Sequence, residues 1–221
     1  MARPGGRAGQ LQSIVSKCIV LEIQEILDGH AMGSRLTYPD RHPGHGGSDA
    51  KADQREASIG GWWSESAEPI KSEVKWFALQ ITRRRFPWAY DKHSPQRRIS
   101  ALELLGTVFL IRLAARSCTM AELDVTVRGI TDSQCNSYAM LKNYSRKLPL
   151  AAVHMELMSV AAQFAIWPRI SHVRREFNTW ADDLTENKLE GFSPHNRWEP
   201  EMHKNFFNVL DNLLAIPGAA S

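Results

Sequence analysis

The chain has 221 residues, 43% of them apolar, and carries a formal net charge of +3 with a pI of about 8.8. This size suits one domain with flanking segments, and the mild basic excess permits a polyanionic partner without requiring one. The start of the chain lacks the apolar run of a signal peptide, and the longest apolar run, around 104–113, is too short to cross a bilayer. We therefore expect an intracellular protein, cytoplasmic or nuclear, that is neither secreted nor inserted in a membrane.

The amino-terminal fifth of the chain differs in composition from the rest. Residues 1–10 are rich in Gly and Arg, and apolar residues at helical spacing predict a helix over 11–28. Residues 30–47 are rich in Gly, Pro, His and Asp, which is typical of a flexible linker. We expect a tail, a helix and a linker over 1–47, and a folded domain over 48–221.

The folded part begins with three predicted strands and a long helix. Residues 48–63 suit a strand, a turn and a second strand, and the β-branched and aromatic residues of 74–82 predict a third strand. The helix predicted over 99–116 is almost entirely apolar in its middle, so it should be buried.

The remainder of the domain alternates strands with helices. We predict a strand, two helices, a strand and two more helices over 123–131, 134–147, 150–166, 169–175, 178–187 and 199–215. Three consecutive strands can form an antiparallel meander, and strands reached through a helix can lie parallel to the first strand. The predicted fold class is therefore α/β, with a five-stranded mixed sheet in the order 3-2-1-4-5 and helices on both faces.

Four acidic residues stand where this topology would bring them together. They are Asp49 at the start of the first strand, Glu103 in the first turn of the long helix, Asp132 at the end of the fourth strand and Asp182 in the late helix. Clustered carboxylates repel one another, and divalent cations that prefer oxygen ligands would relieve this repulsion. The four acids are thus candidate ligands for Mg²⁺ or Mn²⁺.

Each acid also has an ordinary structural explanation. Glu103 completes an S-x-x-E capping box with Ser100. Asp132 stands where a turn or a helix N-cap often has an aspartate. Asp53 is an alternative to Asp49 as the metal ligand of the first strand, and Asp183 is an alternative to Asp182 in the late helix. The joint placement of the four acids, rather than any one of them, favours a metal site.

Residues 48–215 resemble the ribonuclease H region of retroelement polyproteins. The matching segments are Ser48-Asp49-Ala50 ahead of a strand with Gly60-Gly61, then 99–105, 131–136 and 172–184. The last segment is the most specific, because it combines a strand with N-x-x-A-D-x-L at the start of a helix. The resemblance implies a ribonuclease H-like fold and hydrolysis of the RNA strand of an RNA–DNA hybrid with two Mg²⁺ ions.

The family's catalytic acids come in the order Asp, Glu, Asp, Asp, which falls here on Asp49, Glu103, Asp132 and Asp182. The resemblance implies that Asp49 bridges both ions and that the products carry 5′-phosphate and 3′-hydroxyl ends. The family often has a mobile histidine shortly before the last catalytic helix, and the sequence analysis identifies no counterpart for it.

Nucleic-acid contacts are expected beside these acids. Neutral donors and acceptors are needed to read the 2′-hydroxyl of RNA, and Ser133, Gln134 and Asn136 lie just past the fourth strand. A helix N-cap is the competing role for these three residues. Further candidates precede the late helix, with the arginines as phosphate contacts: Arg174, Arg175 and Asn178.

Other functions compete with an active nuclease. No Tyr-x-Asp-Asp polymerase motif occurs, so a reverse transcriptase encoded elsewhere is a possible partner, and the helix over 11–28 resembles the end of a polymerase or connecting segment. A catalytically silent connection or scaffold domain that binds nucleic acid is one alternative, and a decayed element copy is another. A transposase or integrase of related fold has its acids in the order Asp, Asp, Glu, so Glu103 and Asp182 favour ribonuclease H.

Overall fold

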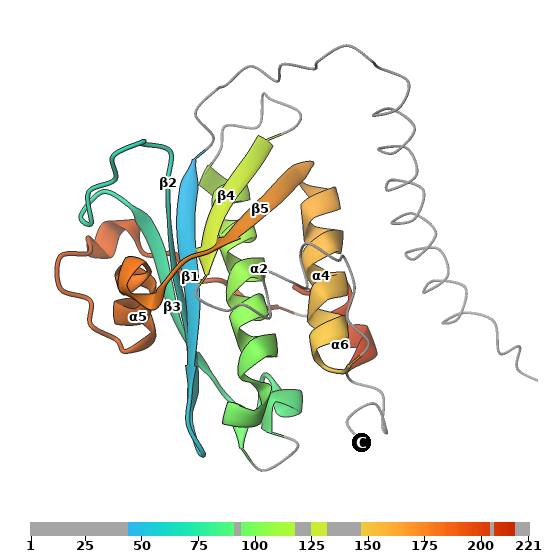
Figure 1. Ribbon diagram of the computed structural model, residues 1–221. Coiled ribbons are helices and arrows are strands. Elements are labelled where there is room, and N and C mark those ends of the chain that lie inside the picture. The colour runs from blue at the N-terminus through green and yellow to red at the C-terminus, as the bar shows by residue number, and fades with distance from the viewer. Residues whose placement is uncertain (1–43, 91–93, 118–124, 132–146, 204–205, 215–221) are drawn as a thin grey trace, which may run out of the picture. The chain divides into compact units, whose positions relative to one another are not determined.

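The computed structural model describes residues 44–90, 94–117, 125–131, 147–203 and 206–214, all within the unit His42–Ser221. Five strands form its sheet (Figure 1): β1 His45–Ala52, β2 Ala57–Ser64, β3 Lys75–Ile81, β4 Val125–Thr131 and β5 Ile166–His172. The strand order is β3-β2-β1-β4-β5, with β2 antiparallel to both of its neighbours and β4 parallel to β1 and β5. The predicted strand order is confirmed.

Strand β1 begins three residues before the start of the predicted domain. His45, Gly46 and Gly47 pair with Ser64, Trp63 and Trp62 of β2. A Cβ atom at Gly46 would lie only 2.3 Å from the Trp62 carbonyl oxygen, so the close approach of the two strands requires glycine here. Gly46 and Gly47, which the sequence analysis assigned to a linker over 30–47, are therefore part of β1. Any linker must end before His45.

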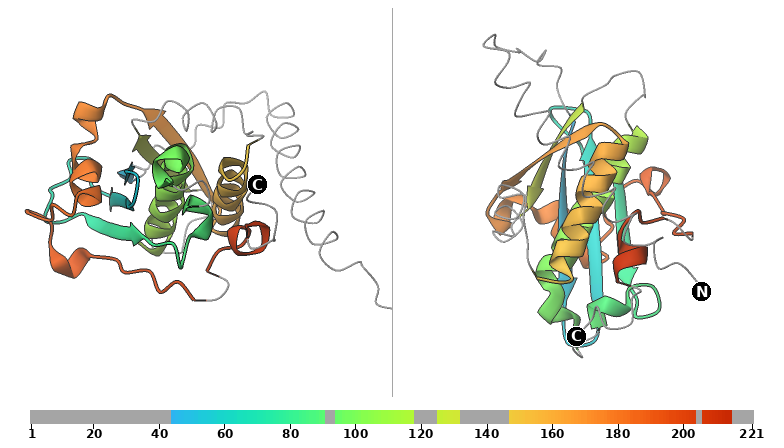
Figure 2. Two further views of the ribbon diagram at one scale, coloured as in Figure 1. Left: turned by 90° about the horizontal axis from the view of Figure 1, so that it is seen from below. Right: turned by 90° about the vertical axis from the view of Figure 1, so that its right-hand side faces the viewer.

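Helices cover both faces of the sheet (Figures 1 and 2). The α-helices are α2 Ile99–Ser117, α4 Leu150–Gln163, α5 Thr179–Thr185 and α6 Leu210–Leu213. The short 3-10 helices are η1 Pro87–Tyr90, η2 Pro95–Arg98, η3 Arg175–Phe177 and η4 Pro194–Asn196. Two adjacent glycines of β1 identify the faces. A Cβ atom at Gly46 would contact Leu110 of α2, whereas one at Gly47 would contact Asn178 at the start of α5.

The main core lies between the sheet and α2. Ten of the nineteen residues of α2 are apolar and 3% exposed or less: Ala101, Leu102, Leu104, Leu105, Val108, Phe109, Leu110, Ile111, Leu113 and Ala114. Helix α4 lies beside α2 and also contacts β5, and its Val153, Leu157 and Val160 belong to the same buried cluster. The expectation of a buried apolar helix is confirmed.

The predicted bounds of three elements are wrong. The helix predicted over 150–166 ends at Gln163, because Ala165 adopts a left-handed conformation with φ 51°, and β5 then begins at Ile166 rather than at residue 169. Of the helix predicted over 199–215, the described residues form only α6. The segment before it is held by tertiary contacts: the Trp198 backbone N–H donates to the Trp76 carbonyl of β3 at 2.7 Å. The Phe206 ring stacks on Phe109 of α2 with centroids 5.6 Å apart.

The helices predicted over 11–28 and 134–147 fall outside the described residues, apart from residue 147. Within the described part of the chain, no helix is both long and apolar enough to span a membrane.

Candidate active site

Asp49 lies in the middle of the sheet and is 6% exposed. It pairs with Gly60 of β2, and it is two residues from Gly47, so its side chain projects from the face of β1 that α5 covers. The preceding residue faces the other way, because the Ser48 and Thr107 hydroxyls lie 3.3 Å apart across the interface with α2. A strand thus presents one carboxylate beneath α5 at the centre of the domain.

The carboxyl ends of β4 and β5 come to the same level of the sheet. Gly47 pairs with Ile130, so one further residue brings Thr131, the last residue of β4, level with Ser48. Thr131 in turn pairs with His172, the last residue of β5. The chain therefore leaves β4 beside the Ser48–Asp49 segment. Asp132 follows directly, and it lies outside the described residues, as do Ser133, Gln134 and Asn136.

Helix α2 brings Glu103 to the other side of β1. A Cβ atom at Gly106 would lie 3.3 Å from the Asp49 carbonyl oxygen, so the helix packs directly on the strand backbone at this point. Glu103 is three and four residues before Gly106 and Thr107, and therefore lies on the same helical face. Helix α2 begins at Ile99, directly after η2. Ser100 consequently lies inside the helix and is not its N-cap, which contradicts the capping-box alternative.

Helix α5 is fixed to the sheet at its start and at its end. The Asn178 side-chain amide nitrogen donates to the Ser48 carbonyl at 3.1 Å, and Asn178 is 2% exposed. The Ser58 hydroxyl donates to the Thr185 carbonyl at 2.7 Å. Between them, a Cβ atom at Gly60 would lie 2.6 Å from the Leu184 Cβ, so only glycine allows this approach. Asn178, an expected nucleic-acid contact, thus anchors α5 and has almost no surface to offer a ligand.

The two neighbouring acids of α5 have different partners. The Asp182 carboxylate pairs with the Arg175 guanidinium at 2.5 Å, and its side chain is 27% exposed. The Asp183 carboxylate pairs with Lys71, between β2 and β3, at 2.9 Å. Asp183 therefore ties α5 to the β2–β3 connection, whereas Asp182 faces the segment that leads out of β5.

Asp53, the rival of Asp49, has a local structural role. It lies between β1 and β2, and its Oδ1 accepts hydrogen bonds from the backbone N–H groups of Arg55 and Glu56 at 2.6 and 2.8 Å. These bonds, chiefly the one from Glu56, hold the pKa of Asp53 below its usual range. This arrangement is that of an Asx-turn in a hairpin.

The described carboxylates do not make up the predicted metal site by themselves. Among the residues that the structure describes, no three His, Cys, Asp or Glu side chains form a group that could hold a metal ion. Asp49, Glu103 and Asp182 come from three elements that meet at β1, and the fourth predicted ligand, Asp132, is outside this part of the chain. Their carboxylate oxygens are of the type that Mg²⁺ and Mn²⁺ prefer.

His172 is a candidate functional residue that the sequence analysis missed. It is exposed, it ends β5, and it pairs with Thr131, so it stands at the same edge as the chain leaving β4. The available signal was a histidine at the carboxyl end of a strand, ten residues before Asp182. Arg174 and Arg175 follow it, with side chains 81% and 70% exposed.

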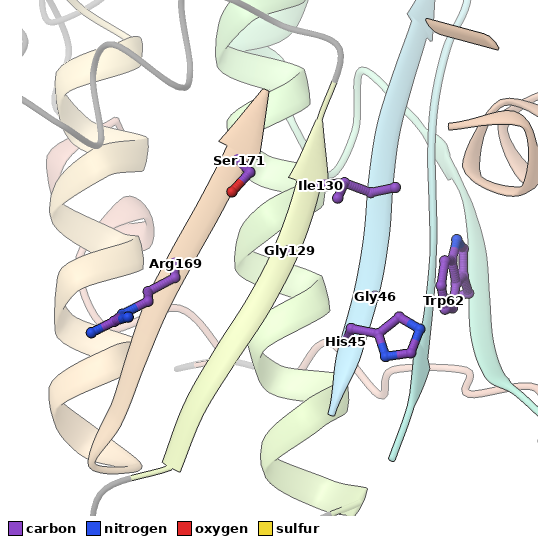
Figure 3. Close-up of a pocket in the computed structure, with 7 residues that line it drawn as sticks. All are labelled: His45, Gly46, Trp62, Gly129, Ile130, Arg169 and Ser171. Carbon is purple, nitrogen blue, oxygen red and sulfur yellow. The ribbon is translucent and has the colours of Figure 1, made fainter. Parts of the chain in front are cut away.

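A pocket of about 500 Å³ opens on the face of the sheet that α5 covers (Figure 3). Its floor is the backbone of β1 and β4, and its lining consists of His45, Gly46, Trp62, Gly129, Ile130, Arg169 and Ser171. Figure 3 shows Arg169 at one end of this strip and His45 with Trp62 at the other.

The sequence matches no protein-family model and no curated protein. Among solved structures, the fold is similar to RNase H1 from the halophilic archaeon Halobacterium salinarum, at 18% identity over 66% of this chain and 97% of that chain, with a TM-score of 0.44. It is similar to LC11-RNase H1 in complex with an RNA/DNA hybrid, at 16% identity over 65% and 94% of the chains, with a TM-score of 0.44. It is also similar to a foamy viral protease-reverse transcriptase in complex with an RNA/DNA hybrid, at 9% identity over 72% and 21%, with a TM-score of 0.41.

The strand order and the helices on both faces of the sheet define a ribonuclease H-like fold.

Proposed function

We propose that the protein is a metal-dependent endonuclease that cleaves the RNA strand of RNA–DNA hybrids. The observation that carries the proposal is the meeting of acid-bearing elements at one level of the sheet. Asp49 projects from β1 beneath α5, the helix that holds Asp182. Helix α2, which holds Glu103, packs at Gly106 on the Asp49 carbonyl and the Ser48 side chain of the same strand. A scaffold that only binds nucleic acid has no need of acids at this point.

The proposed catalytic and metal-binding residues are Asp49, Glu103, Asp132 and Asp182. Divalent cations, when bound, would lower the pKa of a water molecule and stabilise the leaving oxygen. The chain's own contribution is to hold the carboxylates on rigid elements, since Asn178 anchors α5 and Gly106 allows α2 to approach. The products would carry 5′-phosphate and 3′-hydroxyl ends.

His172 completes the proposed site. We place it in the role of the mobile histidine that such enzymes often have, because it is exposed at the end of β5 opposite Thr131. An imidazole there could form a hydrogen bond with a water molecule or with a phosphate oxygen of the substrate. Ser133, Gln134 and Asn136 remain proposed readers of the 2′-hydroxyl, and Arg174 a proposed phosphate contact.

A retroelement origin is part of the proposal. It rests on the sequence motif over 172–184 and on the order of the four acids along the chain. A reverse transcriptase encoded elsewhere is then the expected protein partner, since ribonuclease H acts on the hybrids that such polymerases make.

A catalytically silent nucleic-acid-binding scaffold is the second candidate, and one observation favours it. The Arg175 guanidinium pairs with the Asp182 carboxylate, as in a structural ion pair. An exposed pair of this kind contributes only about 0–1 kcal/mol, so a bound metal ion could displace the arginine at little cost.

Cleavage of an RNA–DNA hybrid labelled on its RNA strand tests the proposal. We expect 5′-phosphate products with Mg²⁺ or Mn²⁺, none with EDTA, and none from duplex DNA. Asp182→Asn should abolish cleavage, whereas Asp183→Asn serves as the matched control because Asp183 pairs with Lys71. A folded protein that binds hybrid but cuts it under none of these conditions supports the scaffold instead.

A further inference from the structure

Phe177 is a large apolar side chain left in solvent beside the candidate active site. It is 66% exposed, more than Ile70 or Leu148, the other exposed large apolar residues of the described chain. It ends η3, directly before Asn178 and α5. A single exposed apolar residue is ordinary by itself, so the residues around Phe177 decide what it can bind.

The turn that carries Phe177 is rigidly held. The Phe177 backbone N–H donates to the Arg174 carbonyl at 2.9 Å, and the Asn178 N–H donates to the Arg175 carbonyl at 3.0 Å. The Asn178 side chain then fixes the end of the turn to Ser48 of β1. The ring is therefore presented from a fixed backbone, so little conformational entropy would be lost when it contacts a ligand.

The charges around Phe177 favour an anionic partner. The Arg174 side chain is 81% exposed, and its guanidinium lies 3.7 Å from the Glu176 carboxylate. Because this ion pair is exposed to solvent, it is weak and leaves Arg174 able to contact a ligand. Exposed Arg169 stands on the same face of the sheet, at one end of the pocket over β4. A Cβ atom at Gly47 would contact Asn178, the residue after Phe177, and also Trp62 and Ile130, which line the pocket. The turn that carries Phe177 and the pocket therefore lie on the same face of the sheet.

We propose that this surface, defined by Phe177, Arg174 and Arg169, binds an unpaired stretch of nucleic acid that continues from the hybrid. An exposed aromatic ring next to cations is the usual arrangement for a single strand, whose free bases stack on the ring while the cations follow the phosphates. A fully paired duplex hides its base faces and offers the ring no such contact. The proposal goes beyond cleavage of the hybrid, because it assigns a second ligand to a separate surface.

The test is binding of a short fluorescent oligothymidylate to the full chain in EDTA, measured by anisotropy. Phe177→Ala should weaken binding about tenfold, as expected for the loss of one stacked base, and Phe177→Trp should keep it. Arg169→Ala should weaken binding and reduce the slope of log affinity against log salt by about 0.7, the value per phosphate contact for a single strand. Ile70→Ala and Arg84→Ala, which remove an exposed apolar group and an exposed cation elsewhere, should bind like the wild type.

Unchanged affinity of folded Phe177→Ala overturns the proposal, and so does an equal loss in Ile70→Ala. An Arg84→Ala variant as weak as Arg169→Ala overturns the assignment of Arg169, because binding would then follow net charge alone. Hybrid cleavage by the same wild-type preparation in Mg²⁺ separates this proposal from the proposed function. If the wild type binds oligothymidylate but does not cleave the hybrid, only the proposed nuclease activity is contradicted. If the wild type cleaves the hybrid and Phe177→Ala binds oligothymidylate as tightly as the wild type, only the single-strand surface is contradicted.

Discussion

Replacement of Asn178 should loosen α5 on the sheet. Its side-chain amide nitrogen donates to the Ser48 carbonyl at 3.1 Å, and both residues are 2% exposed. Loss of the donor leaves a buried acceptor unpaired, which costs about 1–3 kcal/mol. The buried Asn178 Oδ1 has no hydrogen-bond partner among the residues that the structure describes, so Asn178→Ala also removes one unsatisfied atom. We therefore expect a loss of about 1–2 kcal/mol in the free energy of unfolding. For a domain of this size, that lowers the melting temperature by about 2–8 °C.

Asn178→Asp is the sharper version of this experiment. The aspartate has the same shape as asparagine but places a carboxylate oxygen against the Ser48 carbonyl, in a buried position. An uncompensated buried charge costs about 3–5 kcal/mol, so the isosteric change should destabilise more than truncation to alanine. Urea unfolding and thermal melting followed by circular dichroism at neutral pH measure both variants. Asn212→Ala, at an exposed amide, is the matched control and should change stability by less than about 0.5 kcal/mol. An Asn178→Asp protein as stable as wild type would refute the reasoning.

Three further outcomes are expected. Gly60→Ala should lower stability by about 1–3 kcal/mol in urea unfolding and reduce hybrid cleavage, because its Cβ would stand 2.6 Å from a side-chain carbon of α5; unchanged values would contradict the packing. Burial lowers the pKa of His154 in the folded state below 6.5, so below about pH 6.5 the unfolded state binds more protons and the free energy of unfolding should fall as the pH drops. His154→Leu should flatten this pH dependence, whereas His195→Leu, at an exposed histidine, should not. Asp49→Asn should reduce cleavage by more than about a hundredfold, whereas Asp53→Asn should retain activity, and the reverse ranking would reassign the ligand.

The strand order and the burial of α2 were predictable because both follow from local patterns. Alternation over 123–131 and the apolar middle of 99–116 leave few ways to build a two-layer domain, and the crossover rules restrict them further. The positions of Asp49 and Glu103 relative to β1 followed from this topology. The ion pairs of Asp182 with Arg175 and of Asp183 with Lys71 were not predictable, because the periodicity of a sequence carries no information about which side chains pair.

The errors arose where tertiary contacts outweigh local propensity. The segment before α6 has the composition of a helix, but Trp198 and Phe206 pack on Phe77 and Phe109, and the backbone follows these rings. The glycines of 45–47 resemble a linker until their close pairing with β2 is known. The anchoring role of Asn178 likewise depends on a contact between residues 130 positions apart.

The melting temperature with and without Mg²⁺ tests most directly whether the acids converge on a metal site. A ligand that binds only the folded state stabilises it by about 2.7 kcal/mol at a hundred times its Kd, which for this size is about 5–10 °C. We predict this rise for the wild type and for Asp53→Asn, and its loss in Asp49→Asn. A wild type that melts at one temperature in EDTA and in saturating Mg²⁺, or an Asp49→Asn variant that keeps the full shift, would contradict the account.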